Sequence, residues 1–176
     1  MLVLKDVNDE GGGGWDLREV LRTEMRWQTW YTVTRWMRGL RALDRDLSWS
    51  EVHPKPTPEE MRYAVRTLCV MNLKKEPGAS SSNRTEVQRF AREDAAYLRE
   101  QFELYAPDLV ICGGVGPLFA SVMESGVWKQ TRRGVQYVEI QSGCHMISYY
   151  HPQARYPMDM LYYTLVDAVR EIRGYS

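Results

Sequence analysis

Short apolar runs alternate with segments of helical periodicity along the 176-residue chain, and this alternation limits the possible folds more than any other feature. Runs at 2–4, 67–72, 108–112 and 145–150 have the length and composition of strands. The apolar character of 67–72 is expected for a strand of a parallel sheet that is covered on both faces. Repeated strand and helix units predict an α/β fold: a three-layer α/β/α sandwich with a central, mostly parallel four-stranded sheet.

Two of the expected helices carry clear start signals. Thr57 can cap a short helix that begins at Pro58, because proline is well tolerated in the first helical turn. Thr85 and Gln88 have the spacing of a capping box, and the helix that they begin is expected to end before Pro107. These helices lie on either side of the expected strand at 67–72.

Three further helices and one more strand complete the expected fold. Apolar residues recur at helical spacing over 16–44, with one break, over 115–124 and over 158–173. The segment 135–140 alternates polar and apolar residues, which is typical of an exposed or edge strand. No repeat or linker interrupts the pattern, so we expect a single domain over 1–176.

The charge balance restricts the kind of partner that the chain can bind. Its 23 basic and 23 acidic side chains cancel, which excludes a highly basic chromatin protein and an acidic disordered tail. Any contact with DNA must therefore come from a local patch. No apolar run approaches the roughly 20 residues of a membrane span, and the first residues have the pattern of a strand rather than a signal sequence. We expect a cytoplasmic protein that does not bind membranes.

The cysteines do not form a metal-binding pattern. Cys69, Cys112 and Cys144 are odd in number, widely spaced, and lie within or beside apolar runs, where cysteine behaves as a small hydrophobic residue. Neither a CxxC pair nor a set of four thiolates for an iron–sulfur cluster is present. We expect buried free thiols and a monomeric protein that works without metal or cofactor.

Polar residues that end the expected strands are the first candidates for a functional site, because ligands bind beyond the carboxyl ends of strands in such sheets. Three strand ends carry them. Asp6, Asn8 and Asp9 follow the first strand, Asn72 ends the second, and His151 follows the last.

These three segments, in this order, resemble the uracil-DNA glycosylase superfamily. That superfamily has a water-handling acidic or amide residue after its first strand, a base-recognising Asn at the end of a middle strand, and a His-Pro pair after its last strand. The matching segments here are 4–9, 70–73 and 150–153, so the resemblance spans nearly the whole chain. Each motif is only two or three residues long, and their order and common place at strand ends carry the resemblance. It implies an enzyme that excises bases from DNA.

Cleavage of an N-glycosidic bond leaves positive character on the sugar and negative charge on the base, so a catalyst must stabilise both and deliver water. The resemblance implies that Asp6 orients the water or stabilises the sugar cation. It implies that Asn72 reads the edge of the flipped-out base with its amide, and that His151 donates a hydrogen bond to the base O2. A loop-capping Asp, a turn Asn and a loop His-Pro pair are the structural alternatives.

Further residues are candidates for contact with DNA. Trp15 follows the glycines 11–14 and offers an aromatic ring for stacking on the base. Basic and hydroxyl side chains near Asn72 and His151 can bind phosphates. In the superfamily a side chain after His-Pro fills the space that the flipped base leaves, and Gln153 is one candidate here. The expected DNA-binding residues are Lys74, Lys75, Ser80, Ser81, Arg155 and Tyr156.

The segment after the first strand departs from the uracil-specific branch of the superfamily. That branch has a Tyr that excludes 5-substituted pyrimidines, and the corresponding residue here is Asn8. Asn8 therefore belongs to the expected catalytic and base-binding set, and the glycines that follow leave room for a larger base. We expect a 5-modified pyrimidine as substrate, such as hydroxymethylated or glucosylated cytosine of phage DNA, and hence a role in defence.

Other functions remain open at this point. Uracil or mismatched thymine in DNA repair is the alternative substrate. The fold alone also allows a nucleoside hydrolase or deoxyribosyltransferase that acts on small molecules. A DNA-binding module without catalytic activity is the third alternative.

Overall fold

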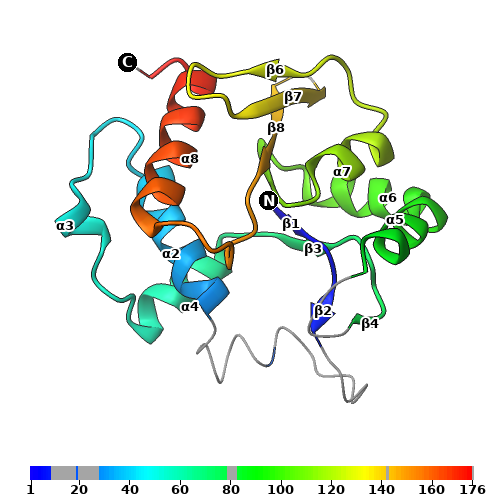
Figure 1. Cartoon of the computed structure of the whole chain (residues 1–176), viewed down its shortest axis with the longest axis horizontal. Helices are drawn as coiled ribbons and strands as arrows, with labels where there is room; N and C mark the ends of the chain where they lie inside the picture. The colour runs from blue at the N-terminus through cyan, green and yellow to red at the C-terminus, as the bar shows by residue number, and fades with distance from the viewer. Residues whose placement is uncertain (9–18, 20–27, 79–82, 142, 176) are drawn as a thin grey trace. The chain divides into compact units, whose positions relative to one another are not determined.

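The computed structural model describes residues 1–8, 19, 28–78, 83–141 and 143–175 (Figure 1). The chain divides into two compact units, which are considered separately. The first unit comprises Met1–Asp16, Cys69–Lys129 and Gln136–His151, and the second comprises Leu17–Leu68, Gln130–Val135 and Pro152–Ser176. Strands and helices alternate along the chain, which confirms the α/β class.

The main sheet has six strands rather than the expected four. Its spatial order is β3 (Val70–Asn72), β1 (Leu2–Leu4), β5 (Leu109–Gly113), β8 (Cys144–Tyr149), β7 (Gln136–Gln141) and β6 (Lys129–Gln130). The first four are parallel to one another, and β7 is antiparallel to β8. Only two residues separate β7 from β8, and so short a connection permits only an antiparallel pair. The four parallel strands match the four expected apolar runs, β7 corresponds to the edge strand expected at 135–140, and β6 was not expected.

A second, two-stranded sheet joins the segments that follow β1 and β3. In it β2 (Val7–Asn8) pairs in parallel with β4 (Pro77–Gly78), so that the backbone of Asn8 lies opposite Gly78. The sequence pattern indicated loops at both places. This pairing brings together the backbones of two segments that carry expected site residues.

Three helices belong to the first unit: α5 (Arg84–Glu93), α6 (Ala95–Tyr105) and α7 (Gly116–Val122). The single helix expected before Pro107 is wrong, because the backbone of Asp94 leaves helical geometry and separates α5 from α6. The expected capping residue is also wrong. Asn83 caps α5, and its Oδ1 accepts hydrogen bonds from the backbone N–H groups of Thr85 at 3.0 Å and Glu86 at 3.3 Å. An Asn side chain caps a helix as well as the expected Thr.

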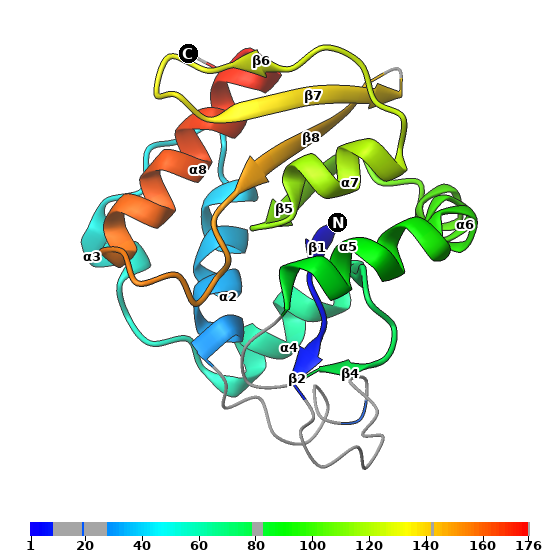
Figure 2. The same cartoon turned by 45° about the vertical axis from the view of Figure 1, so that its right-hand side comes forward.

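These helices bury one side of the sheet in the first unit. Val3, Met71 and Met146 of the sheet belong to the same buried cluster as Phe102 of α6 and Phe119 of α7, and Figure 2 shows the three helices together. Alternation along each strand sends every second side chain into this cluster. The cysteines are free thiols, as expected, with Cys112 and Cys144 buried and Cys69 half-buried. Burial raises the pKa of the Cys112 thiol, so this side chain stays protonated.

The second unit contains α2 (Gln28–Leu40), α3 (Trp49–Val52), α4 (Pro58–Arg66) and α8 (Met158–Arg173). The sequence predicted α8 within these bounds, whereas α2 ends at Leu40 rather than near 44. Gly39 permits close packing of α2 on α8, since a Cβ atom here would lie 2.5 Å from Tyr162 Oη. None of the described helices is long and apolar enough to cross a membrane.

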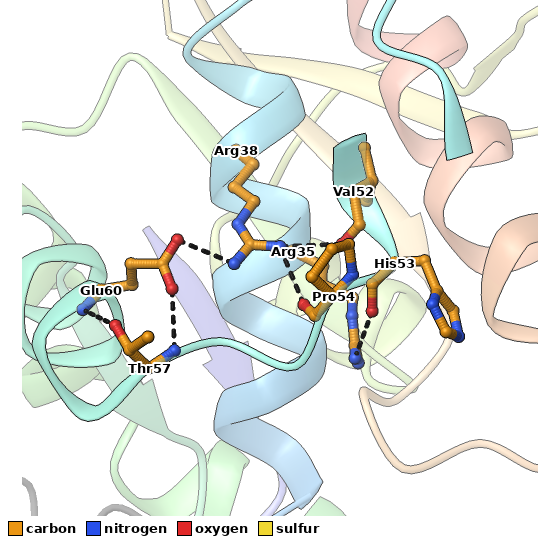
Figure 3. Close-up of polar contacts among 7 residues, drawn as sticks. All are labelled: Arg35, Arg38, Val52, His53, Pro54, Thr57 and Glu60. Atoms are coloured by element: carbon orange, nitrogen blue, oxygen red, sulfur yellow. Dashed lines mark hydrogen bonds and ion pairs between the residues drawn. The ribbon is translucent and has the colours of Figure 1, made fainter. Parts of the chain in front are cut away.

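Hydrogen bonds from α2 fix the Pro-rich connection that precedes α4 (Figure 3). Arg38 donates to the carbonyl oxygens of Val52 at 2.8 Å and Pro54 at 3.0 Å, and it pairs with Glu60 at 2.8 Å. Glu60 also accepts from the backbone N–H of Thr57 at 2.7 Å, which completes the capping box of α4. Prolines leave such a connection with few backbone donors of its own, so arginine side chains supply them.

Candidate functional site

The carboxyl ends of the four parallel strands meet at one edge of the sheet. Leu4 of β1 lies beside Asn72 of β3, and the backbone N–H of Lys74 donates to the Lys5 carbonyl at 2.9 Å. At the other pair of strand ends, the N–H of Gly114 donates to the Tyr149 carbonyl at 2.7 Å. This edge therefore gathers the residues that follow β1, β3, β5 and β8, including the three strand-end candidates.

His151 lies half-buried directly beyond the end of β8. Burial lowers the pKa of its imidazole, the positive charge of Lys5 lowers it further, and the carboxylate of Asp6 acts in the opposite direction. The side chains after β1 are thus close enough to act electrostatically on His151. With a pKa below its ordinary value of 6.5, the imidazole is neutral at pH 7 and offers one N–H donor.

Asn72 presents a buried acceptor that its surroundings do not use. Within the described part of the chain, its Oδ1 is buried and has no hydrogen-bond partner. Leaving such an atom unpaired costs about 1–3 kcal/mol, so most buried polar atoms are paired. The other atoms of this kind among the described residues belong to α2, to Tyr162 of α8, and to His145. His145 lies near the amino end of β8, so among the described residues of the first unit only Asn72 has such an atom at the carboxyl edge.

Some expected site residues cannot be placed at this edge through their side chains. Trp15, Ser80 and Ser81 lie outside the described residues. Asn8 is placed by its backbone alone, in β2 opposite Gly78. Their roles in binding the base or DNA stay predictions.

The two expected DNA-binding lysines contact side chains of the first unit. The Lys74 side chain is 5% exposed, pairs with Glu86 at 3.1 Å, and lies 5.2 Å from the centre of the Phe90 ring. A phosphate at Lys74 would compete with this ion pair. The Lys75 ammonium donates to Gln101 Oε1 at 2.6 Å, and burial lowers its pKa. These contacts favour a role for Lys74 in holding α5.

Arg155 and Tyr156 belong to the second unit, and both are exposed. They follow His151 in the chain by four and five residues. The exposed Gln153 lies in the same segment. Exposure leaves these side chains accessible to a nucleic acid, and their DNA-binding role stays a prediction.

A cavity of about 230 Å³ lies next to the strand ends, and the sequence pattern did not reveal it. It is lined by Lys5, Arg84, Val87, Gly114, Val115, Pro117 and Leu118. Gly114 has φ +75°, a conformation that suits glycine, and a Cβ atom here would lie 3.8 Å from Lys5 Cε. The sequence offered one signal for this cavity, which is the position of Lys5 directly after β1.

The described residues of this edge offer acid–base groups and hydrogen-bonding side chains. Among the described residues, no three His, Cys, Asp or Glu side chains lie together as metal ligands. No protein-family model matches the chain, and no curated protein matches its sequence. The residues at the sheet edge are therefore the basis on which a function can be assigned.

Proposed function

We propose that this chain is a monofunctional DNA glycosylase, which hydrolyses the N-glycosidic bond of a flipped-out pyrimidine and leaves an abasic site. The observation that carries the proposal is the buried, unpaired Oδ1 of Asn72 at the sheet edge that also holds Asp6 and His151. An unsatisfied amide at the same sheet edge as a neutral imidazole and a carboxylate offers one group for each task of base excision.

Asn72 would bind the base through its edge. Its free Oδ1 can accept a hydrogen bond from a ring N–H or an exocyclic amine, while its Nδ2 can donate to a neighbouring base acceptor. A flipped base would thereby satisfy the acceptor that is unpaired in its absence. Enzymes that act on a base commonly read it in this way after taking it out of the stack.

Asp6 and His151 would act on the bond itself. As the C1′–N1 bond breaks, its electron pair moves to the base, and the neutral His151 can donate a hydrogen bond to the O2 atom, where negative charge develops. Asp6 would stabilise the positive sugar and orient water, whose oxygen bonds to C1′. One proton of this water ends on the released base, so that no metal or cofactor is needed.

The proposed substrate is a pyrimidine modified at C5. Asn8 takes the place of the bulky gate of the uracil-specific branch, and C5 points away from the base edge that Asn72 would read. Hydroxymethylated or glucosylated cytosine of phage DNA fits this description, and we assign the protein a defensive role on that basis. Uracil would lose packing contacts in a wider pocket and react slowly.

A substrate panel tests the proposal. Duplex and single-stranded DNA containing uracil, mismatched thymine, hydroxymethylcytosine or glucosylated hydroxymethylcytosine is incubated with the protein, and released base and alkali-labile sites are measured. We expect release of the modified bases. Release of uracil alone would refute the wide pocket but support the assignment as a DNA glycosylase. Cleavage of free nucleosides without action on DNA would refute both the wide pocket and the glycosylase assignment.

A further inference from the structure

A second cavity continues the first along α5. It measures about 170 Å³ and is lined by Arg84, Gln88, Arg92, Pro117, Leu118 and Ser121. Arg84, Pro117 and Leu118 line both cavities, so the two form one groove between α5 and α7. We call this surface the α5–α7 groove.

The groove carries uncompensated positive charge. Lys5, Arg84 and Arg92 line it, and none of its described lining residues is acidic. The carboxylates of α5 are engaged elsewhere, as Glu86 pairs with Lys74 at 3.1 Å and Glu93 with Arg89 at 2.9 Å. Within the described ranges, no ion pair involves Arg84 or Arg92. Such a surface attracts an anion.

The spacing of its polar side chains suits an extended anion. Arg84, Gln88 and Arg92 are four residues apart and therefore share one face of α5. At 1.5 Å per residue the two arginines are separated by about 12 Å along the helix. This separation exceeds the size of one phosphate group, so the two arginines would contact different phosphates of an extended anion. The groove is longer than one phosphate requires.

The position of the groove connects it to the reaction site. Lys5 follows β1 and Gly114 follows β5, and the chain order reverses between these two neighbouring strands. Ligands of open α/β sheets bind at this reversal, beyond the carboxyl ends of the strands. Gly114 donates its backbone N–H to the carbonyl of Tyr149 at 2.7 Å, so one end of the groove lies close to the end of β8, which His151 follows.

We propose that the α5–α7 groove binds the sugar–phosphate backbone of the DNA strand that carries the target base. This inference rests on the proposed glycosylase function, and it adds the path of the strand and three binding residues. Lys5 contacts the phosphate nearest the reaction site, while Arg84 and Arg92 contact phosphates farther along. Val87, Val115 and Leu118 form the apolar floor on which the sugars pack.

The test measures binding of a labelled single-stranded oligonucleotide without any modified base, over a series of salt concentrations. Arg84→Ala and Arg92→Ala should each weaken binding by about tenfold, as expected for loss of one charge-assisted contact. Each should lower the slope of log affinity against log salt by about 0.7, and the double variant by about twice that. Arg84→Lys should retain most of the slope, because it keeps the charge.

Arg89→Ala is the matched control. Arg89 lies on the same helix, is exposed, and pairs with Glu93 rather than lining the groove, so its loss should leave the salt slope unchanged. Equal effects of Arg84→Ala, Arg92→Ala and Arg89→Ala would overturn the proposal. So would binding of a deoxynucleoside monophosphate as tightly as the oligonucleotide, since a strand gains from several contacts. Melting temperatures verify that all variants are folded.

Base release is measured separately, which distinguishes the groove from the proposed function. If the single variants lower the salt slope and no DNA of the substrate panel loses a base, the DNA-binding role of the groove is supported and the glycosylase proposal is refuted. If the protein releases base while the slope of Arg84→Ala and Arg92→Ala equals that of the unmodified protein, the groove fails and the glycosylase stands.

Discussion

Two arginine-lined hollows, one in each unit, differ in how their charges are balanced. The hollow of the second unit measures about 470 Å³ and is lined by Arg132, Arg133, Asp167, Arg170, Glu171 and Tyr175. Arg132 pairs with Glu171 at 3.4 Å and Arg133 with Asp167 at 2.6 Å, while Arg170 lies 3.7 Å from Asp46. Among the described residues that line the α5–α7 groove, the charged ones are all cations.

Unpaired charges and unpaired hydrogen-bonding atoms, rather than the size of a hollow, therefore indicate where a ligand binds. A cation that already has a carboxylate partner gains little from a second anion, because the field of the pair falls off quickly. The same reasoning separates two asparagines of the first unit. The Oδ1 atom of Asn83 accepts hydrogen bonds from backbone N–H groups at the N-terminus of α5, whereas the Oδ1 atom of Asn72 has no partner among the described residues. The predictions below test this distinction.

The largest effect is expected at Asn72. Asn72→Ala should lower single-turnover excision by about 10³-fold, comparable to the loss of one essential hydrogen-bonding group in an active site, with the fold intact. Asn83→Ala is the matched control, since it should cost about 1 kcal/mol of stability as a lost cap and leave excision at saturating enzyme unchanged. Equal loss of excision in both variants would contradict the distinction between them.

His151 should control the pH dependence. His151→Ala should slow bond cleavage by about 10²–10³-fold, as for one lost donor to developing negative charge. The neutral imidazole is the proposed active form and its pKa is lowered, so activity should be constant near pH 7 and fall only below pH 6.5. Since Lys5 lowers this pKa, Lys5→Met should move the acid limb to higher pH; Asp6→Asn should move it to lower pH.

An NMR titration of the His151 ring checks the assignment. The ring resonance and the acid limb of the rate should shift together in the Lys5 and Asp6 variants. An acid limb that moves without the His151 titration would assign the limb to another group. The same lowered pKa favours folding at pH above 6.5, and this contribution to stability is lost as pH falls below that value, because the unfolded state then binds the extra proton.

Local patterns predicted those parts of the fold that local chemistry determines. The apolar stripe of 158–173 gave the bounds of α8, and Thr57 with Pro58 gave the start of α4. The interruption between α5 and α6 was missed because Phe90 and Leu98 are eight residues apart, which keeps the apolar stripe in phase across Asp94. The spacing of apolar residues cannot reveal a break between two helices when the apolar residues on both sides of the break continue the same stripe.

The site divides in the same way. The common place of Asp6, Asn72 and His151 at one sheet edge could be predicted, because parallel strands bring their carboxyl ends together, and their roles stay predictions. The place of Arg84 beside them could not be predicted, because the cavity that it shares with Lys5 arises where the start of α5 lies beside the loop after β5. That contact joins segments far apart in the chain, and no short pattern encodes it.

A smaller effect, on stability, is expected at Arg38. Its guanidinium donates to Val52 and Pro54 and pairs with Glu60, so Arg38→Ala should lower the free energy of unfolding by about 1–3 kcal/mol. The Thr57 backbone N–H and then Arg38 lower the pKa of Glu60 below 4.5, so its contribution is present above pH 4.5 and lost as pH falls below it. Urea titrations at pH 7 and pH 3 measure the loss of stability in Arg38→Ala and the pH dependence of the Glu60 contribution. Excision by Arg38→Ala at saturating DNA should be unchanged.

The smallest effect is expected in the second-unit hollow, and it bears most directly on the comparison. Arg133→Ala removes a cation from a hollow larger than the α5–α7 groove, yet Asp167 already balances that charge. The salt slope of oligonucleotide binding should therefore stay within error of the unmodified protein, and stability should change by at most about 1 kcal/mol, as for other exposed ion pairs. Asp167→Asn is the informative partner variant, because it leaves Arg133 unbalanced without removing it. If the ion pair with Asp167 keeps Arg133 from binding DNA, Asp167→Asn should increase the salt slope of oligonucleotide binding. A salt slope that is lowered by Arg133→Ala would instead show that paired arginines also bind the strand.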